Sequence, residues 1–196
     1  MELAKVKTNR LFVFLFLIII GCGETEQKQK EQPQNVVDDL GKSFFVDSIP
    51  QKVITLAPNL TEMIYELGVG NKLVGNTFYC NYPQEANDVE KVGDLLTINY
   101  EKILELKPDI IFLTVEGNTK EGYDKLTGLG FKVFISNPRD FEGIKKTLLD
   151  LSIIFNKEEI ADSMIADWNG RLDQLKKVVD RNSQKSAMFL ISLQPI

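Results

Sequence analysis

The chain has 196 residues and a net charge of −5, so it is long enough for one domain with a sizeable core. It contains no histidine and two cysteines, which excludes Ser-His-Asp and Cys-His catalysis and a thiolate zinc site. The mildly acidic balance has no basic stripe, so nucleic acid is not an expected partner.

An apolar run at residues 11–20 follows three basic residues and ends at Gly21-Cys22. A basic segment before about 7–15 apolar residues is typical of an export signal, whereas a spanning helix needs about 20. The sequence Ile-Ile-Gly-Cys resembles the bacterial lipobox, which implies a lipoprotein signal peptide at 1–22 with Cys22 lipidated as the mature N-terminus. Acyl chains would hold the protein at a membrane surface. The alternative is a plain signal peptide with an incidental cysteine.

Residues 23–36 are polar and low in complexity, which predicts a flexible tether. A buried strand is expected at 53–57. The helix after it is expected to have Asn59 as its N-cap, Glu62 completing a capping box, and Gly68 as its stop.

Strands and helices then alternate, with strands expected at 72–78, 109–115 and 132–136 and helices at 99–107, 120–130 and 140–155. The helix at 99–107 is expected to begin at an Asn99 cap. This order predicts βαβ units in a Rossmann-like α/β lobe with a mostly parallel sheet, over residues 37–156. The continuous apolar run at 109–115 indicates a sheet covered on both faces. Ligands bind beyond the carboxyl ends of such strands, here the loops that begin at Pro58, Thr77, Thr114 and Ser136.

Apolar residues recur at helical spacing across 157–182, which predicts a long helix on which Trp168 packs. A new strand is expected within 183–196. A strand that begins directly after a long helix is typical of entry into a second lobe, which would be truncated in this chain.

Four blocks together resemble the periplasmic binding proteins of ABC importers, in the helical-backbone class that carries vitamin B12, iron-siderophores and haem. They are KVITLAPNLTEMIYELGVGNKLVG, YCNYPQEANDVEKVGD, NYEKILELKPDIIFL and LTGLGFKVFI. The resemblance implies two α/β lobes joined by a rigid helix, with the ligand in the cleft between them. Residues 37–156 would be the N-terminal lobe, 157–182 the interdomain helix and 183–196 the start of the second lobe.

The resemblance also implies a function. The chain would be the extracytoplasmic, lipid-anchored substrate-binding component of an ABC importer. It would capture a corrinoid (cobalamin) or an iron chelate (siderophore or haem) and deliver it to a permease dimer with its ATPase subunits. No enzymatic activity, cofactor or resident metal is expected.

Site residues follow from the same resemblance. Tyr79 falls where the family presents a ligand-facing aromatic, and the loop at Pro58 and Asn59 faces the cleft. The B12-binding members place tryptophans at the positions of Leu95 and Thr114, neither of which is aromatic here, and this disfavours cobalamin. On residue type alone, Tyr79 could simply pack in its loop and Asn59 could simply cap a helix. Tyr82 is expected to pack.

Glu101 matches a family glutamate that docks into an arginine pocket of the permease. Its simpler interpretation is a solvated carboxylate in the first turn of a helix.

Two other functions stay open. An enzyme of the doubly wound class would need a phosphate loop, but GVGNKLVG fits neither GxGxxG nor GxxxxGK[ST]. A lipid-anchored single-lobe interaction module without transport activity would bind a partner surface and no small ligand. A zinc or manganese receptor would be expected to use histidine, which the chain lacks.

Overall fold

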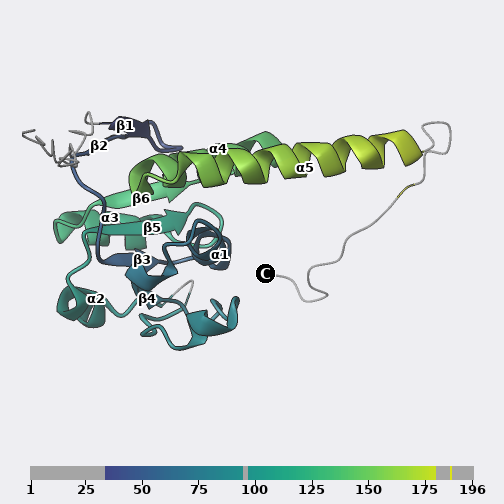
Figure 1. Cartoon of the computed structure of the whole chain (residues 1–196). Helices are drawn as coiled ribbons and strands as arrows, with labels where there is room; N and C mark the ends of the chain where they lie inside the picture. Colours follow the sequence, from purple (N-terminus) through teal and green to yellow (C-terminus); the bar gives the residue numbers. More distant parts are fainter. Residues whose placement is uncertain (1–33, 95–96, 180–185, 187–196) are drawn as a thin grey trace, which may run out of the picture. The chain divides into compact units, whose positions relative to one another are not determined.

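The computed structural model describes residues 34–94, 97–179 and 186, and its centre is a four-stranded parallel sheet. The strands are β3 (Val53–Thr55), β4 (Leu73–Asn76), β5 (Ile110–Thr114) and β6 (Val133–Ser136). Their order across the sheet is β4-β3-β5-β6, so β4 and β6 are the edge strands (Figure 1). An antiparallel hairpin of β1 (Gln34–Val37) and β2 (Ser43–Val46) precedes the sheet.

The α-helices of the described residues are α1 (Pro58–Glu66), α2 (Tyr100–Leu106), α3 (Lys120–Gly128), α4 (Phe141–Phe155) and α5 (Glu158–Val178). Two short 3-10 turns, η1 (Gly70–Lys72) and η2 (Gln84–Asn87), flank β4. None of these helices is both long and apolar enough to cross a lipid bilayer.

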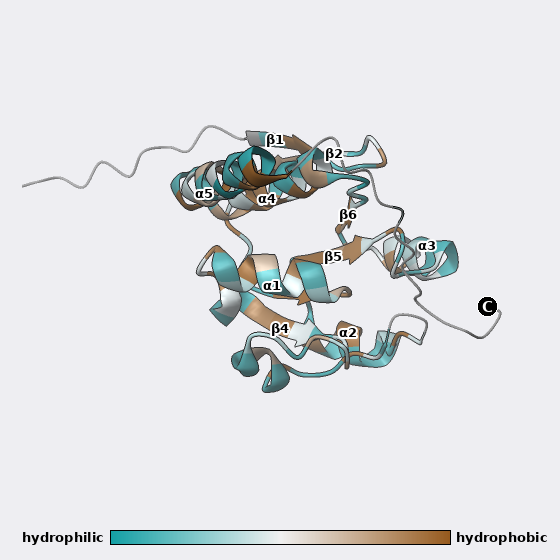
Figure 2. Cartoon of the chain, turned by 90° about the vertical axis from the view of Figure 1, so that its right-hand side faces the viewer, coloured by the Kyte–Doolittle hydropathy of each residue, from teal (hydrophilic) through white to brown (hydrophobic). Residues whose placement is uncertain are grey.

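Both faces of the sheet are buried, because successive side chains of a strand point to opposite faces and helices cover each of them. On one face, Phe112 and Phe134 belong to a core shared with α1, α4 and α5. On the other face, Ile111 and Ile135 belong to a core shared with α2 and α3. All five residues of β5 are buried, and this strand is almost uniformly hydrophobic (Figure 2). The predicted α/β lobe with a parallel sheet is therefore confirmed.

The connections reverse direction between β3 and β5. The chain passes from β3 through α1 to β4 on one side, then through α2 to β5 on the other side of β3. In doubly wound sheets such a switch point opens a crevice at the carboxyl ends of the two strands, and ligands bind there. The topology thus marks the ends of β3 and β5 as a binding position.

The start of α1 differs from the predicted capping box. The N-cap is Ala57, with no side-chain hydrogen bond, and Pro58 occupies the first helical turn. Proline is favoured at that position because its fixed φ suits the helix and its missing N–H is not needed. Asn59 therefore lies inside the helix instead of capping it. The predicted stop is confirmed, since Gly68 follows the helix with φ +73°.

Helix α5 is the predicted long helix, with 21 residues. Its first half lies on α4, where the Trp168 ring centroid is 6.1 Å from that of Phe141, so Trp168 packs as predicted. Its last turns run past the sheet (Figure 1), and Val178 is 78% exposed. The strand predicted within 183–196 lies outside the described residues, apart from residue 186.

The hairpin corrects one predicted boundary. Strand β1 begins at Gln34, inside the segment 23–36 that the composition predicted as a tether. Val36 is 2% exposed and Phe44 8%, and both join the core beneath α4. Two apolar residues of the hairpin thus attach it to the core, so this part of the predicted tether is held in place.

Candidate ligand-binding site

The carboxyl edge, defined as the edge at which β3, β4, β5 and β6 end, gathers most of the predicted ligand residues. Pro58 and Asn59 follow β3, Tyr79 follows β4, and Thr114 is the last residue of β5. Because all four strands are parallel, these residues emerge on the same side of the sheet. The predicted position of Leu95 lies outside the described residues.

A small polar cavity of about 170 Å³ opens at this edge, beside the switch point between β3 and β5. Its lining residues are Asn59, Thr114, Glu116, Ser136, Asn137 and Pro138. The structure therefore brings Asn59 and Thr114 together, as the topology of the strands requires. Glu116 and Asn137 are additions that the sequence did not single out, although a polar residue directly after a buried strand is a usable signal at such an edge.

The polar cavity holds one unused acceptor and several engaged ones. Within the described part of the chain, Asn137 Oδ1 is buried and accepts no hydrogen bond. Ser136 Oγ, in contrast, lies 2.7 Å from Thr147 Oγ1, and Thr114 Oγ1 accepts from the amide of Gly117 at 3.2 Å. A buried acceptor without a partner is costly, so Asn137 is suited to receive a donor from a ligand.

An ion pair borders the same cavity. Arg139 Nη1 lies 2.7 Å from Glu116 Oε1, and both side chains are largely exposed. The pair leaves the rim near neutral, which suits a ligand group without strong charge.

The aromatic loop, defined as residues 77–90 after β4, presents ring surface to solvent. Phe78 is 65% exposed, Tyr79 57% and Tyr82 61%. Tyr79 is therefore available for stacking, but it does not line the polar cavity. The expectation that Tyr82 packs is wrong. Exposed aromatic groups of this kind are typical of interaction surfaces, since a ring can stack on a flat partner.

Lys91 fixes the base of the aromatic loop. Its Nζ donates to Asn76 Oδ1 at 2.7 Å, to the carbonyl of Ala86 at 2.9 Å and to that of Cys80 at 3.1 Å. Asn76 Nδ2 donates to the Ala86 carbonyl as well, at 2.9 Å. Burial lowers the pKa of the Lys91 ammonium. The side chain thus acts as an internal clamp for the loop that carries Tyr79.

Glu101 lies at a separate cavity of about 550 Å³ that also borders the aromatic loop. It occupies the first turn of α2, whose N-cap Asn99 accepts from the Lys102 amide at 3.0 Å, as the sequence predicted. The Glu101 side chain is exposed, and Phe78 and Tyr100 line the same cavity. A carboxylate at this position can reach a cationic partner without crossing the polar cavity.

Metal binding has no visible site here. Among residues 34–94 and 97–179, no three His, Cys, Asp or Glu side chains come together in a way that could hold an ion.

Comparison with known proteins identifies the class. The model of the periplasmic binding protein family matches residues 53–195, and the chain belongs to this family. The vitamin B12-binding protein of Vibrio campbellii is 31% identical over 152 residues, covering 78% of this chain and 55% of the relative. That of Vibrio cholerae is 34% identical over 146 residues, covering 74% and 53%.

Solved structures agree. The periplasmic vitamin B12 binding protein of Vibrio cholerae superimposes with a TM-score of 0.61 and 36% identity, over 66% of this chain and 51% of that one. A periplasmic heme binding protein from Pseudomonas aeruginosa gives 0.62 and 26%, over 65% and 46%. The chain spans about half the length of the curated relatives it matches. Membership of the family implies an extracytoplasmic location.

Proposed function

We propose that this chain belongs to the substrate-binding component of an ABC importer, and that it contributes the carboxyl edge to the binding of a corrinoid or an iron chelate such as a siderophore or haem. The observation that carries the proposal is the combination, at one edge, of exposed aromatic rings with a polar cavity at the switch point. A flat, partly polar ligand can stack on the rings and hydrogen-bond in the cavity.

The relatives supply the ligand classes. Two of them are named as vitamin B12-binding proteins and a structural neighbour as a heme-binding protein. In the proposed two-lobe protein the ligand would be shared between lobes. We therefore expect this chain alone to bind its ligand only weakly, with a dissociation constant above the micromolar range.

The test is calorimetric titration of the purified chain with cyanocobalamin, haemin and a ferric siderophore. Weak binding of one of the three, reduced by Tyr79→Ala, supports the proposal. Micromolar or tighter binding contradicts the expectation that a second lobe is needed. No binding at all favours the alternative, a lipid-anchored single-lobe module that contacts a partner surface.

Docking to the permease is proposed for Glu101. Carboxylate–arginine pairs at an interface set register and partner choice, and a rim charge acts mainly on the association rate. We expect Glu101→Gln to slow association with permease-containing vesicles by about threefold to tenfold at low salt. Glu121→Gln is the matched control, because Glu121 is also an exposed carboxylate in the first turn of a helix. Equal effects of the two substitutions would contradict a specific role for Glu101.

The anchor is proposed from the sequence alone, because Cys22 lies outside the described residues. Labelling of cells with a radioactive fatty acid should mark the wild-type chain and not Cys22→Ser, which should also leave the membrane fraction. Persistent labelling of Cys22→Ser would contradict lipidation at this residue.

A further inference from the structure

The outer edge of β6 is covered by side chains and backbone of the β1–β2 turn. β6 is the last strand of the sheet, so one row of its backbone groups faces away from β5. Asp39 N donates to the carbonyl of Ile135 at 3.0 Å, and the amide of Ile135 lies 3.4 Å from Asp38 Oδ2. The amide of Asn137 donates to Asp39 Oδ2 at 2.5 Å. The turn thus satisfies groups that an open edge would leave free.

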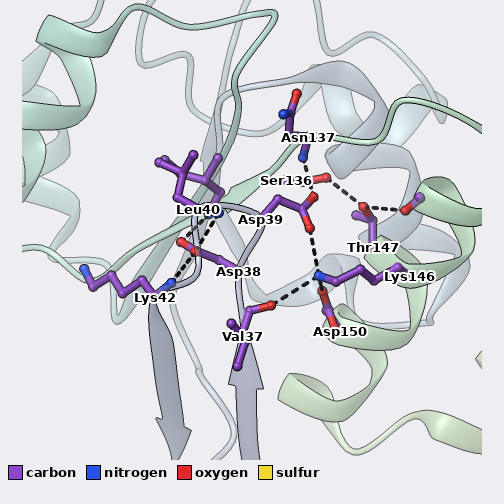
Figure 3. A network of polar contacts seen from close by, with 12 residues as sticks. Val37, Asp38, Asp39, Leu40, Lys42, Ser136, Asn137, Lys146, Thr147 and Asp150 are labelled. Atoms are coloured by element: carbon purple, nitrogen blue, oxygen red, sulfur yellow. Dashed lines mark hydrogen bonds and ion pairs between the residues drawn. The ribbon is translucent and has the colours of Figure 1, made fainter.

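The Asp39 carboxylate is held from two directions, as Figure 3 shows. While Oδ2 accepts from the Asn137 amide, Oδ1 accepts from Lys146 Nζ at 2.8 Å. Lys146 is itself fixed by Asp150 Oδ2 at 2.7 Å and by the carbonyl of Val37 at 3.2 Å. The Asp39 side chain is 18% exposed, so solvent competes little for these contacts. Hydrogen bonds to an ionised acceptor are stronger than neutral ones.

Asn137 and Pro138 are the residues through which this arrangement reaches the ligand edge. Both line the polar cavity, and Asn137 carries the buried acceptor that has no partner there. The neighbouring Arg139 forms the ion pair with Glu116 at the cavity rim. A shift of the Asn137 backbone would therefore change both the position of the acceptor and the shape of the cavity.

We propose that Asp39 is a positioning residue for the ligand-binding edge: by holding the Asn137 amide, it fixes the loop 137–139 in the conformation that forms the polar cavity. The matched family region begins at residue 53, so the hairpin lies outside it. The consequence for ligand affinity rests on the proposed function, whereas the effect on the loop does not.

The experiment uses the full chain and the substitution Asp39→Asn, which keeps the shape of the side chain and removes its charge. Amide hydrogen exchange, read residue by residue, should become about tenfold faster at Asn137 and Arg139, the factor expected when a charged acceptor is lost. Exchange in β3 and β5 should not change. Asp47→Asn is the matched control, because Asp47 is an exposed carboxylate at the end of the same hairpin.

A second reading separates positioning from general stability. Affinity for whichever of cyanocobalamin, haemin and the ferric siderophore binds the wild-type chain should fall about threefold to tenfold in Asp39→Asn. The effects of Tyr79→Ala and Asp39→Asn on this affinity should add, since the two residues act on different loops. Lys146→Met, which leaves Asp39 in place, should show the same pattern of exchange at smaller amplitude and serves if Asp39→Asn does not fold.

Unchanged exchange at Asn137 and Arg139 in a folded Asp39→Asn chain would overturn the inference. So would equal acceleration across the whole sheet, which is what a purely structural role predicts. If the wild-type chain binds none of the probes, the proposed function is contradicted, and the exchange data still decide the role of Asp39.

Discussion

The two ends of the carboxyl edge are built by opposite charges. At the β4 end, the cation of Lys91 gathers three oxygen atoms and holds the aromatic loop. At the β6 end, the carboxylate of Asp39 gathers a backbone amide and the Lys146 ammonium and holds the loop 137–139. The loop after β4 turns carbonyls inward, whereas the loop after β6 presents the Asn137 amide. The polarity of the exposed backbone thus decides which kind of side chain can secure each loop.

The two ends also present different surfaces. Exposed rings lie at the β4 end and a small polar cavity lies towards the β6 end. A ligand with a flat face and peripheral hydrogen-bonding groups would use both. Breaking each end separately shows which of them contributes more.

The largest effect is expected from Lys91→Met, which removes the clamp of the aromatic loop. Its loss leaves the buried Asn76 Oδ1 and the Cys80 carbonyl without their donor, whereas the Ala86 carbonyl keeps the donor of Asn76 Nδ2. We expect the free energy of unfolding in urea to fall by about 2–4 kcal/mol. Lys177→Met, at an exposed position near the end of α5, should change it by less than about 0.5 kcal/mol. A similar loss in both variants would show that the clamp has no special role.

Removal of an aromatic ring at the β4 end should lower the affinity for the ligand without unfolding the chain. Tyr79→Ala is expected to reduce affinity about threefold to tenfold, because an aromatic contact contributes about 0.5–1.5 kcal/mol. Phe45→Ala is the control, since Phe45 is 67% exposed on the hairpin, away from this loop. If Phe45→Ala weakens binding as much, the ligand does not select the aromatic loop.

The β6 end should show a trade between stability and binding. Asn137→Leu removes an acceptor that is buried without a partner, so we expect the chain to become more stable by about 0.5–1 kcal/mol. The same change should lower the affinity for the ligand, because the ligand's hydrogen-bond donor would lose Asn137 Oδ1 as its acceptor. Urea unfolding and calorimetry on one preparation measure both. A loss of stability together with unchanged affinity would show that Asn137 is a structural residue only.

The smallest effect on stability is expected for Asp109, whose carboxylate, like that of Asp39, accepts from backbone amides but lies at the opposite edge of the sheet. Asp109 Oδ2 accepts from the amides of Gln51 at 2.7 Å and Lys52 at 2.9 Å. These hydrogen bonds, first that of Lys52 and then that of Gln51, lower the pKa of Asp109. A lowered pKa in the folded chain gives stability that is present above about pH 4, the usual range of aspartate, and is lost as the pH falls through the folded value.

The test compares the free energy of unfolding in urea of the wild type and of Asp109→Asn from pH 7 to pH 3. The wild type should be the more stable at pH 7, by about 0.5 kcal/mol or less because Asp109 is exposed and screened. The difference should shrink below about pH 4, where the carboxyl becomes neutral like the amide. A difference that grows as the pH falls would contradict this origin of the shift.

Local patterns predicted the Asn99 cap and the Gly68 stop, because each depends on residues close in the chain. The parallel sheet followed from the order in which strands and helices alternate. The carboxyl-edge loops followed from the strand order, and so did the meeting of Asn59 with Thr114. The predicted start of α1 was wrong because the sequence carries two start signals, Pro58 and Asn59, and the helix begins at the proline.

The contacts through which Asp39 and Lys91 hold their loops were not predictable from local patterns. Asp39 and Asn137 are 98 residues apart, and no local pattern pairs them. The hairpin itself had a signal, since Asp-Asp-Leu-Gly separates two short runs of valine and phenylalanine. The contacts of Lys91 and the exposure of Tyr82 both depend on the conformation of the irregular aromatic loop, which no local sequence pattern specifies.

The most direct test of the account is residue-by-residue mapping of a bound ligand, by amide chemical shifts recorded while the chain is titrated with cyanocobalamin and, separately, with haemin. This measurement tolerates weak binding. We expect one of them to shift the amides that follow β3, β4, β5 and β6, including those of Tyr79 and Asn137. Shifts confined to the opposite edge, around Gln51 and Asp109, would contradict the claim that the carboxyl edge is the ligand-binding surface.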